Sequence, residues 1–304
     1  MKLLYQIIRA ARPEHWIKNL VVFAPLVFSK RIFDSQAWYG SVMAALACCF
    51  ASSFSYIFND IQDKELDRLH PLKKNRPIAS DRLSVYAAVT SSLFVLFIGL
   101  FFAYSVSLLL LLVVAVFVLL HILYSVFLKH VALLDVIVIA LGFVLRAGAG
   151  VVAIRGEISP WLFICIFTIC LFMGFCKRYN EVVTLGDNVD ATNHRPILIE
   201  YTPELLTHLI TLSAGIAIIS YLLYGLSEST IERFGSNYFI YTLPIVVYAV
   251  FRFAMISMKG LYSDPTDLIL HDRPFQITTF VWLLTAVVII FRGNELKTFL
   301  DNLY

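Results

Sequence analysis

Four side chains that carry oxygen atoms follow one another at helical spacing in the segment NDIQDKELDRLHPLKKNRPIAS, residues 59–80. Asn59, Asp63 and Asp67 are four residues apart, and Asp60 follows Asn59 directly. On an α-helix these side chains would form one stripe about 12 Å long. Like charges at this spacing repel unless a cation compensates them, and Mg²⁺ prefers oxygen ligands shared with substrate phosphates. The stripe therefore predicts a Mg²⁺ site for a diphosphate, with these four residues as metal ligands.

A basic half follows the acidic stripe, with two prolines that favour an extended, turn-rich course. Here Lys73 and Arg76 can face phosphate oxygens, and an arginine can bind them through two nitrogens. A second interpretation stays open. The acids would then belong to a solvated helix and pair with Lys64, Arg68 and Lys73, while the basic residues mark a cytoplasmic loop.

Membrane helices must position these residues. The chain has 304 residues, of which 60% are hydrophobic and 15% charged, and its mean hydropathy is +0.80. A soluble domain has about 25% charged residues, and about 20 apolar residues cross a bilayer. The sequence predicts an all-α polytopic membrane protein with one integral membrane domain over 1–304. The nine predicted spans are 17–33, 37–58, 83–103, 106–128, 132–153, 160–180, 204–226, 238–258 and 275–292.

Lysine and arginine are distributed unevenly between the predicted spans. Sixteen of the 24 lie at the N-terminus and in the connections after the even-numbered spans, and six lie on the opposite side. Arg146 and Arg252 fall inside spans. The positive-inside rule therefore predicts a cytoplasmic N-terminus and, with nine spans, a C-terminus on the other side. The connection that holds the aspartates then faces the cytoplasm, as does the predicted active site.

The pattern NDxxDxxxD followed by HPxKxxRPIAS resembles the first aspartate-rich motif of the UbiA superfamily of intramembrane prenyltransferases. Other segments resemble one branch, the decaprenyl-phosphate phosphoribosyltransferases. They are RPEHWIKNLVVFAPLVF at 12–28, YSVFLKHVALLDVIVIALGFVLRAGAG at 124–150, GFCKRYNEV at 174–182 and HDRPF at 271–275. The resemblance covers nearly the whole chain. It implies nine transmembrane helices in a UbiA-like bundle in the bacterial inner membrane, with Mg²⁺ as cofactor and a possible homo-oligomer.

The resemblance also implies an activity: transfer of 5-phosphoribose from 5-phosphoribosyl 1-diphosphate to a polyprenyl phosphate, for cell-wall arabinan precursors. Aromatic prenyltransferases carry a second aspartate-rich motif after the sixth span. That position opens here with Lys177 and Arg178, which suits a site with more phosphate groups. The implied catalytic residues are Asp60, Asp63, Asp67, Lys177 and Arg178. The implied substrate-binding residues are Lys18, Asn59, Lys73, Arg76, Tyr124, Lys129, Asp135, Tyr179, Glu181, Arg195 and Arg273.

Several polar residues near or inside the spans have two interpretations. Lys18 can contact phosphate, or its side chain can extend to the membrane surface. Arg146 and Arg252 can act in the reaction or form internal ion pairs, because charges at membrane depth are costly unless paired. Asp272 stands before Arg273 and a proline, so capping of a helix explains it as well as catalysis does.

Two further functions stay open. An aromatic prenyltransferase that uses an isoprenoid diphosphate would need the same metal–diphosphate site. A transporter or lipid-binding protein without chemistry is a different class. Transporter sites lie near the membrane midplane, whereas the polar clusters here gather at one membrane face, which argues against transport.

Overall fold

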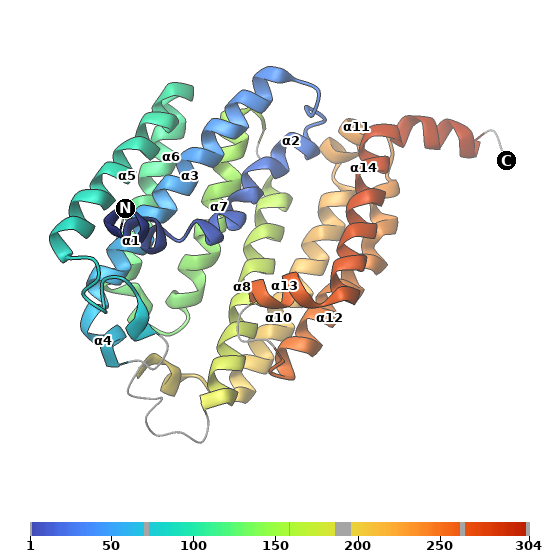
Figure 1. Cartoon of the computed structure of the whole chain (residues 1–304). Coiled ribbons are helices and arrows are strands. Elements are labelled where there is room, and N and C mark those ends of the chain that lie inside the picture. Colours follow the sequence, from blue (N-terminus) through green and yellow to red (C-terminus); the bar gives the residue numbers. More distant parts are fainter. Residues whose placement is uncertain (1, 70–72, 158, 186–195, 262–264, 302–304) are drawn as a thin grey trace. The chain divides into compact units, whose positions relative to one another are not determined.

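The computed structural model describes residues 2–69, 73–157, 159–185, 196–261 and 265–301, and helices make up its regular structure (Figure 1). The chain divides into two compact units. Unit 1 comprises Met1–Leu26, Arg31–Glu157 and Asn193–Pro196, and unit 2 comprises Val27–Lys30, Ile158–Thr192 and Ile197–Tyr304. Each unit is described by itself.

Unit 1 contains the segment with the aspartates. It begins with α1 (Lys2–Ala11) and the 3₁₀-helix η1 (Pro13–Phe23), and α2 (Ala24–Phe28) crosses the division between the units. The remaining elements are α3 (Ser35–Gln62), α4 (Lys64–Leu69), η2 (Lys73–Asn75), α5 (Val85–Val106), α6 (Leu108–Val126), η3 (Leu128–His130) and α7 (Leu134–Ala153). Side-chain caps begin several of these helices: Asp34 accepts hydrogen bonds from the backbone at the start of α3, and Ser84 does so for α5.

Unit 2 contains the segments that follow the predicted fifth span. Its elements are α8 (Pro160–Leu185), η4 (Pro196–Glu200), α10 (Pro203–Leu226), α11 (Glu228–Phe234), η5 (Tyr238–Thr242), α12 (Leu243–Met258), α13 (Pro265–His271) and α14 (Arg273–Asp301). Aromatic rings form its core around Phe239, which lies 5.2 Å from the Tyr221 ring and 5.3 Å from the Phe234 ring.

Among the described residues, eight helical segments are long and apolar enough to cross a membrane. They coincide with eight of the nine predicted spans, so the prediction of an all-α polytopic membrane protein is confirmed. The first predicted span, 17–33, is different: it consists of η1 and the five-residue α2. Pro25 lies in the first turn of α2, where its missing N–H is tolerated, and it cannot donate a helical hydrogen bond back to η1. The count of nine transmembrane helices is therefore not reproduced.

The 3₁₀-helix η1 nevertheless packs along α3, and η1 with α2 has a length of about 30 Å, from eleven residues at about 2.0 Å each and five at about 1.5 Å each. At one end Arg12 forms an ion pair with Asp60, and at the other the rings of Phe23 and Trp38 lie 5.9 Å apart. Asp60 and Trp38 are 22 residues apart on α3, which corresponds to about 33 Å of helix. A hydrocarbon core is about 30 Å thick. A ninth pass of the chain through the membrane therefore fits this geometry, without a ninth long α-helix.

Small residues let the helices of unit 1 approach closely. A Cβ atom at Gly40 would overlap the backbone oxygen of Ala153, and a Cβ atom at Gly150 would overlap that of Val22. These contacts join α3 to α7 and α7 to η1. In membrane proteins such close packing replaces the hydrophobic driving force that lipid does not supply. The packing of α3 against η1 and α7 sets the positions of the polar side chains at the ends of these elements.

Candidate active site

The aspartates lie where α3 passes into α4, at one end of α3 (Figure 1). The α-helix ends at Gln62, and Asp63 is its C-cap. The helical hydrogen bonds nevertheless continue, since Asp63 N–H donates to Asn59 O at 2.9 Å and Asp67 N–H donates to Asp63 O at 2.8 Å. The predicted spacing of the stripe is therefore retained across a short break in the helix.

Two arginines neutralise the first and last carboxylates of the stripe. Arg76 Nη1 bridges them, at 3.1 Å from Asp60 Oδ1 and 2.5 Å from Asp67 Oδ2. Arg12 Nη2 also donates to Asp60 Oδ1, at 2.5 Å. Asp60 and Asp67 are 1% and 3% exposed, so these are buried acids that require such partners. The bridge formed by Arg76 shows that residues 60 and 67 face the same side of the chain.

The middle carboxylate has a different partner. Lys129 Nζ lies 2.5 Å from Asp63 Oδ1 and 3.3 Å from Asn59 Oδ1. Asn59 Nδ2 donates to the other oxygen of Asp63 at 2.9 Å. Lys129 comes from η3, directly after α6, so two separate parts of unit 1 meet here. The structure thus brings together the predicted residues Asn59, Asp60, Asp63, Asp67, Arg76 and Lys129.

The interpretation as a solvated helix named Lys64, Arg68 and Lys73 as partners for these acids, and of the three, Lys73 does act on Asp67. Lys64 and Arg68 instead form ion pairs with Asp81, which is exposed. Burial raises the pKa of the Asp67 carboxyl above its ordinary value, although the adjacent Arg76 acts in the opposite direction. The buried Asp60 and Asp67 therefore face Arg12 and Arg76, and the half-buried Asp63 faces Lys129, while Lys64 and Arg68 belong to a separate surface cluster.

The residues of the stripe suit a divalent cation by their chemistry. All donors are oxygen atoms, as Mg²⁺ prefers, and Asp60 Oδ2 is buried without a hydrogen-bond partner. A buried carboxylate oxygen without a partner is costly, so a cation beside it would be stabilising. Within the described ranges no three Asp, Glu, His or Cys side chains are already grouped as a metal-ion site. A metal ion would therefore have to replace part of the contacts made by the basic side chains.

Arg12 is the main residue that sequence reasoning missed. Its backbone is left-handed, with φ 51° and ψ 62°, a conformation that costs a non-glycine residue about 1–2 kcal/mol. Its guanidinium lies 5.3 Å from the centre of the Tyr56 ring in addition to its contact with Asp60. The sequence signal was a basic residue directly before Pro13, at the predicted membrane surface.

The other predicted residues of unit 1 lie on neighbouring elements. Lys18 is half-buried in η1, Lys73 begins η2, and Tyr124 is half-buried near the end of α6. Asp135 is fully buried in the first turn of α7, where the positive end of the helix dipole favours a carboxylate. The positive charge of Lys73 acts to lower the pKa of the Asp67 carboxyl.

The predicted residues of unit 2 lie mainly near the end of α8. Arg178 is buried and forms an ion pair with Glu181, one turn further along the helix. Lys177 and Tyr179 are half-buried on the same helix, and Arg195 lies outside the described residues. Arg273 is exposed at the start of α14. Unit 2 thus contains a second cationic group, centred on Lys177 and Arg178.

Asp272 and Arg252 have structural partners within unit 2. Arg252 donates from Nε to Asp272 Oδ1 at 3.1 Å and from Nη2 to Asp272 Oδ2 at 2.9 Å. Asp272 Oδ1 also accepts a hydrogen bond from Phe275 N–H at 2.9 Å, so it caps α14. The Arg252 guanidinium holds the pKa of Asp272 below its ordinary value. These contacts favour the capping and ion-pair interpretations of both residues.

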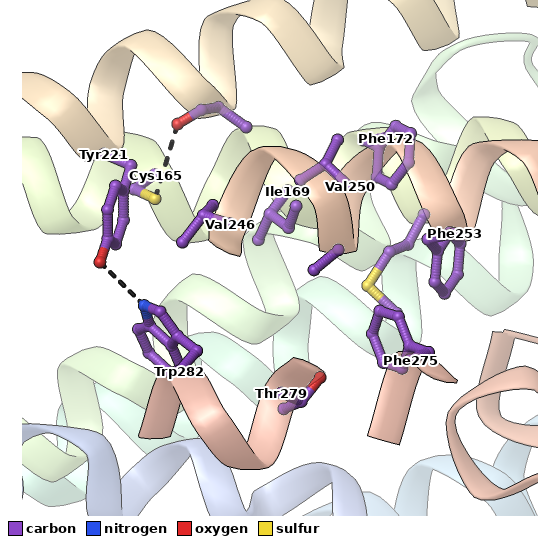
Figure 2. A pocket seen from close by; sticks show the side chains of 13 residues that line it. Cys165, Ile169, Phe172, Tyr221, Val246, Val250, Phe253, Phe275, Thr279 and Trp282 are labelled. Carbon is purple, nitrogen blue, oxygen red and sulfur yellow. Dashed lines mark hydrogen bonds between the residues drawn. The ribbon is translucent and has the colours of Figure 1, made fainter. Parts of the chain in front are cut away.

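Unit 2 also contains an apolar pocket of about 240 Å³ between α8, α10, α12 and α14. Figure 2 shows Phe172, Phe253 and Phe275 toward one end and Tyr221 and Trp282 toward the other. Trp282 Nε1 donates to Tyr221 Oη at 2.8 Å, so the polar atoms at that end are bound to each other. The pocket therefore presents mainly apolar surface to an occupant.

The fold and the site define a multi-pass, all-helical membrane protein with a buried carboxylate stripe and basic side chains around it. The family model described as "UbiA prenyltransferase family" matches residues 22–259. The chain belongs to this family.

Relatives of known name match nearly the whole chain. A decaprenyl-phosphate phosphoribosyltransferase of Corynebacterium glutamicum is 34% identical over 290 residues, which cover 93% of this chain and 86% of that protein. The protein of the same name from Mycolicibacterium smegmatis is 32% identical over 92% of this chain and 90% of its own. A solved UbiA homologue from Archaeoglobus fulgidus, bound to GPP and Mg²⁺, has a TM-score of 0.70 at 19% identity. It covers 94% of this chain and 99% of its own, and it supports the UbiA fold.

Proposed function

We propose that this protein transfers the 5-phosphoribosyl group of 5-phosphoribosyl 1-diphosphate to a polyprenyl phosphate of the decaprenyl type, with release of diphosphate. The observation that carries the assignment is the 34% identity, over 93% of the chain, to an enzyme named for this transfer. The acidic stripe supports it, because a diphosphate held by a divalent cation needs oxygen ligands and nearby positive charge. The polyprenyl length and the role in arabinan precursor synthesis belong to the proposal.

The reaction needs no general base. The bond between ribose C1 and the diphosphate oxygen breaks, and the diphosphate leaves with the bonding electrons. An oxygen of the polyprenyl phosphate, already ionised at neutral pH, forms the new bond to C1. In our proposal Arg12, Arg76 and Lys129 bind the phosphate oxygens of the donor, because charge-assisted hydrogen bonds to phosphate are strong.

Asn59, Asp60, Asp63 and Asp67 are the residues that would hold Mg²⁺, on the basis of their oxygen donors and the unpartnered Oδ2 of Asp60. The ion supplies Lewis-acid stabilisation of the charge that develops on the leaving diphosphate. Lys177 and Arg178 would bind further phosphate groups, with Glu181 orienting Arg178 through their ion pair. Lys18, Lys73, Tyr124, Asp135, Tyr179, Arg195 and Arg273 complete the proposed substrate-binding set.

The polyprenyl chain needs an apolar environment. The pocket of unit 2 is suited to part of this chain by its composition and size. A cavity of about 150 Å³ holds a benzene molecule, so 240 Å³ accommodates on the order of ten carbons, about two isoprene units.

We further propose that the protein lies in the bacterial inner membrane with its N-terminus and active site on the cytoplasmic side, in agreement with the distribution of lysine and arginine.

A substrate-pair assay with purified protein tests this function. One reaction contains labelled 5-phosphoribosyl 1-diphosphate and a polyprenyl phosphate, and the other contains a labelled isoprenoid diphosphate and 4-hydroxybenzoate. We expect a labelled lipid from the first pair, dependent on a divalent cation. Product from the second pair alone would replace this function with that of an aromatic prenyltransferase.

A further inference from the structure

A buried polar cluster in unit 1 lies deeper along α3 than the aspartates. Arg146 of α7 is 5% exposed, and its Nε donates to Asn19 Oδ1 of η1 at 2.7 Å. Its Nη2 donates to Ser52 Oγ of α3 at 3.4 Å. The guanidinium also lies 4.6 Å from the centre of the Phe117 ring. One side chain thus joins η1, α3, α6 and α7 at membrane depth.

Asn19 is the residue of η1 that binds to this cluster. Its side chain is 2% exposed, and Nδ2 donates to Cys49 Sγ at 3.2 Å while Oδ1 accepts from Arg146. A 3₁₀-helix of eleven residues is unusual, because runs longer than three or four residues are uncommon. Such a helix needs tertiary contacts to persist. Three hydrogen bonds of the Asn19 side chain, to Cys49, from Arg146 and from Ser52 Oγ at 3.4 Å, supply contacts of this kind near the middle of η1.

The form of η1 determines where its N-terminal end lies. From Pro13 to Asn19 a 3₁₀-helix rises about 12 Å, whereas an α-helix rises about 9 Å. The two forms also differ by about 120° in rotation over these six residues. Arg12 directly precedes Pro13 and contacts Asp60. A change of η1 to the α form, with Asn19 held, would therefore move Arg12 by about 3 Å and turn it away from Asp60.

We propose that Arg146 is a positioning residue: through Asn19 it holds η1 in the 3₁₀ form and thereby keeps Arg12 against Asp60. It does this from within the membrane-spanning part of α7, away from the reacting atoms. The kinetic part of the test rests on the proposed phosphoribosyl transfer, whereas the position of η1 can be measured without any activity.

The kinetic test is a double-mutant cycle between Arg146 and Arg12. We expect Arg146→Gln to raise the KM for 5-phosphoribosyl 1-diphosphate about tenfold, with the KM for polyprenyl phosphate unchanged, because one charge-assisted contact at the donor site is lost. If Arg146 acts through Arg12, adding Arg146→Gln to Arg12→Ala changes the donor KM less than twofold. Effects that multiply in the double variant would overturn the proposal.

Variants of Asn19 give a matched pair if Arg146→Gln does not fold. Asn19→Asp keeps an oxygen acceptor for Arg146 and should retain the wild-type donor KM. Asn19→Leu has a similar volume but no acceptor, and its donor KM should rise about tenfold. Equal donor KM values for these two variants would overturn the proposal as well. Ser55→Ala is the control on α3, since this hydroxyl donates to Ala51 O of its own helix at 2.9 Å.

The position of η1 is followed through Trp16, whose Nε1 donates to Ser53 Oγ at 3.0 Å. In a protein with Trp38, Trp161 and Trp282 replaced by phenylalanine, acrylamide quenching reports the exposure of Trp16. We expect quenching to rise at least twofold in Asn19→Leu and to stay unchanged in Asn19→Asp and Ser55→Ala. Unchanged quenching in Asn19→Leu would refute the positioning role. A wild-type protein without phosphoribosyl transfer would refute the proposed function alone.

Discussion

At the residue scale, the carboxylates of the stripe differ in their partners although all three follow helical spacing. Asp60 and Asp67 share Arg76, and Asp63 pairs with Lys129. The Oδ2 atom of Asp60 is buried without a hydrogen bond, which distinguishes this carboxylate from the others. Of the three aspartates, Asp60 would therefore be stabilised most by a bound cation.

We expect Asp60→Asn, Asp63→Asn and Asp67→Asn each to lower turnover by at least a hundredfold while the protein stays folded. Each replaces a charged ligand of the proposed Mg²⁺ site by a neutral one, and metal ligands are worth several kcal/mol to the transition state. The measurement is lipid product per minute with purified protein, together with its elution volume in detergent. Asp81→Asn is the control, since Asp81 is exposed and pairs with Lys64. Full activity of all three variants would end the metal-site interpretation.

The cationic group on α8 permits a second test at this scale. We expect Arg178→Ala and Lys177→Ala to raise the donor KM about tenfold or more, because each removes a charged contact to phosphate. Arg292→Ala is a matched control. Arg292 also forms an ion pair with a glutamate three residues later, but its side chain is 65% exposed, compared with 2% for Arg178. If both α8 variants had wild-type kinetics, Lys177 and Arg178 would not bind the donor, and their charge would only reflect the positive-inside rule.

At the scale of elements, glycines of α7 decide how closely η1 can approach. Gly150 faces Val22 of η1, whereas a Cβ atom at Gly148 would meet no other atom within 4 Å. Both residues belong to the same helical turn, so alanine gains the same helix propensity at either position. They differ in what a side chain would contact. The packing of η1 against α7 therefore depends on one glycine of the pair.

We expect Gly150→Ala to lower stability by about 1–3 kcal/mol, because its methyl group must displace a backbone oxygen. Gly148→Ala should leave stability unchanged or raise it by up to about 1 kcal/mol, since alanine favours a helix over glycine. The melting temperature in detergent distinguishes the two. A lower melting temperature for Gly148→Ala than for Gly150→Ala would contradict the close contact of α7 with η1.

The ion pair between α12 and the start of α14 gives a prediction about pH. Because the pKa of Asp272 is held below its ordinary value of 3.8, its ion pair with Arg252 stabilises the folded protein above about pH 4. That stability is lost as the pH falls through the lowered pKa. Asp272→Asn should therefore cost about 1–3 kcal/mol at pH 7 and progressively less below pH 4. Melting temperatures at pH 7, 5 and 3 measure this difference, and a gap that stayed constant with pH would contradict it.

At the scale of the whole molecule, membrane topology depends on how often the chain crosses the bilayer. Eight helices have the required length among the described residues, and η1 with α2 is about 30 Å long. We propose that this segment is the first of nine crossings and that residues 1–304 form one integral membrane domain.

We expect a reporter fused after Tyr304 to be active only on the side opposite the cytoplasm. Sixteen of the 24 lysine and arginine residues place the N-terminus in the cytoplasm by the positive-inside rule, and nine crossings then put the C-terminus outside. A second reporter, inserted at Lys74, should be active only inside. A third reporter, fused at the N-terminus, tests η1 and α2: together with the eight long helices of the described residues, N- and C-termini on the same side of the membrane would mean that η1 and α2 do not cross.

The sequence by itself determined the helical class, the positions of eight membrane helices and the spacing of the acidic stripe. Each of these depends on local properties: apolar length, helical periodicity and the sign of nearby charges. Only the tertiary structure decided which cation meets which carboxylate. Arg12 reaches Asp60 across 48 positions, Lys129 reaches Asp63 across 66, and Arg146 reaches Asn19 across 127. Such pairs are chosen by the packing of helices against one another, and neither hydropathy nor spacing within one segment contains that information.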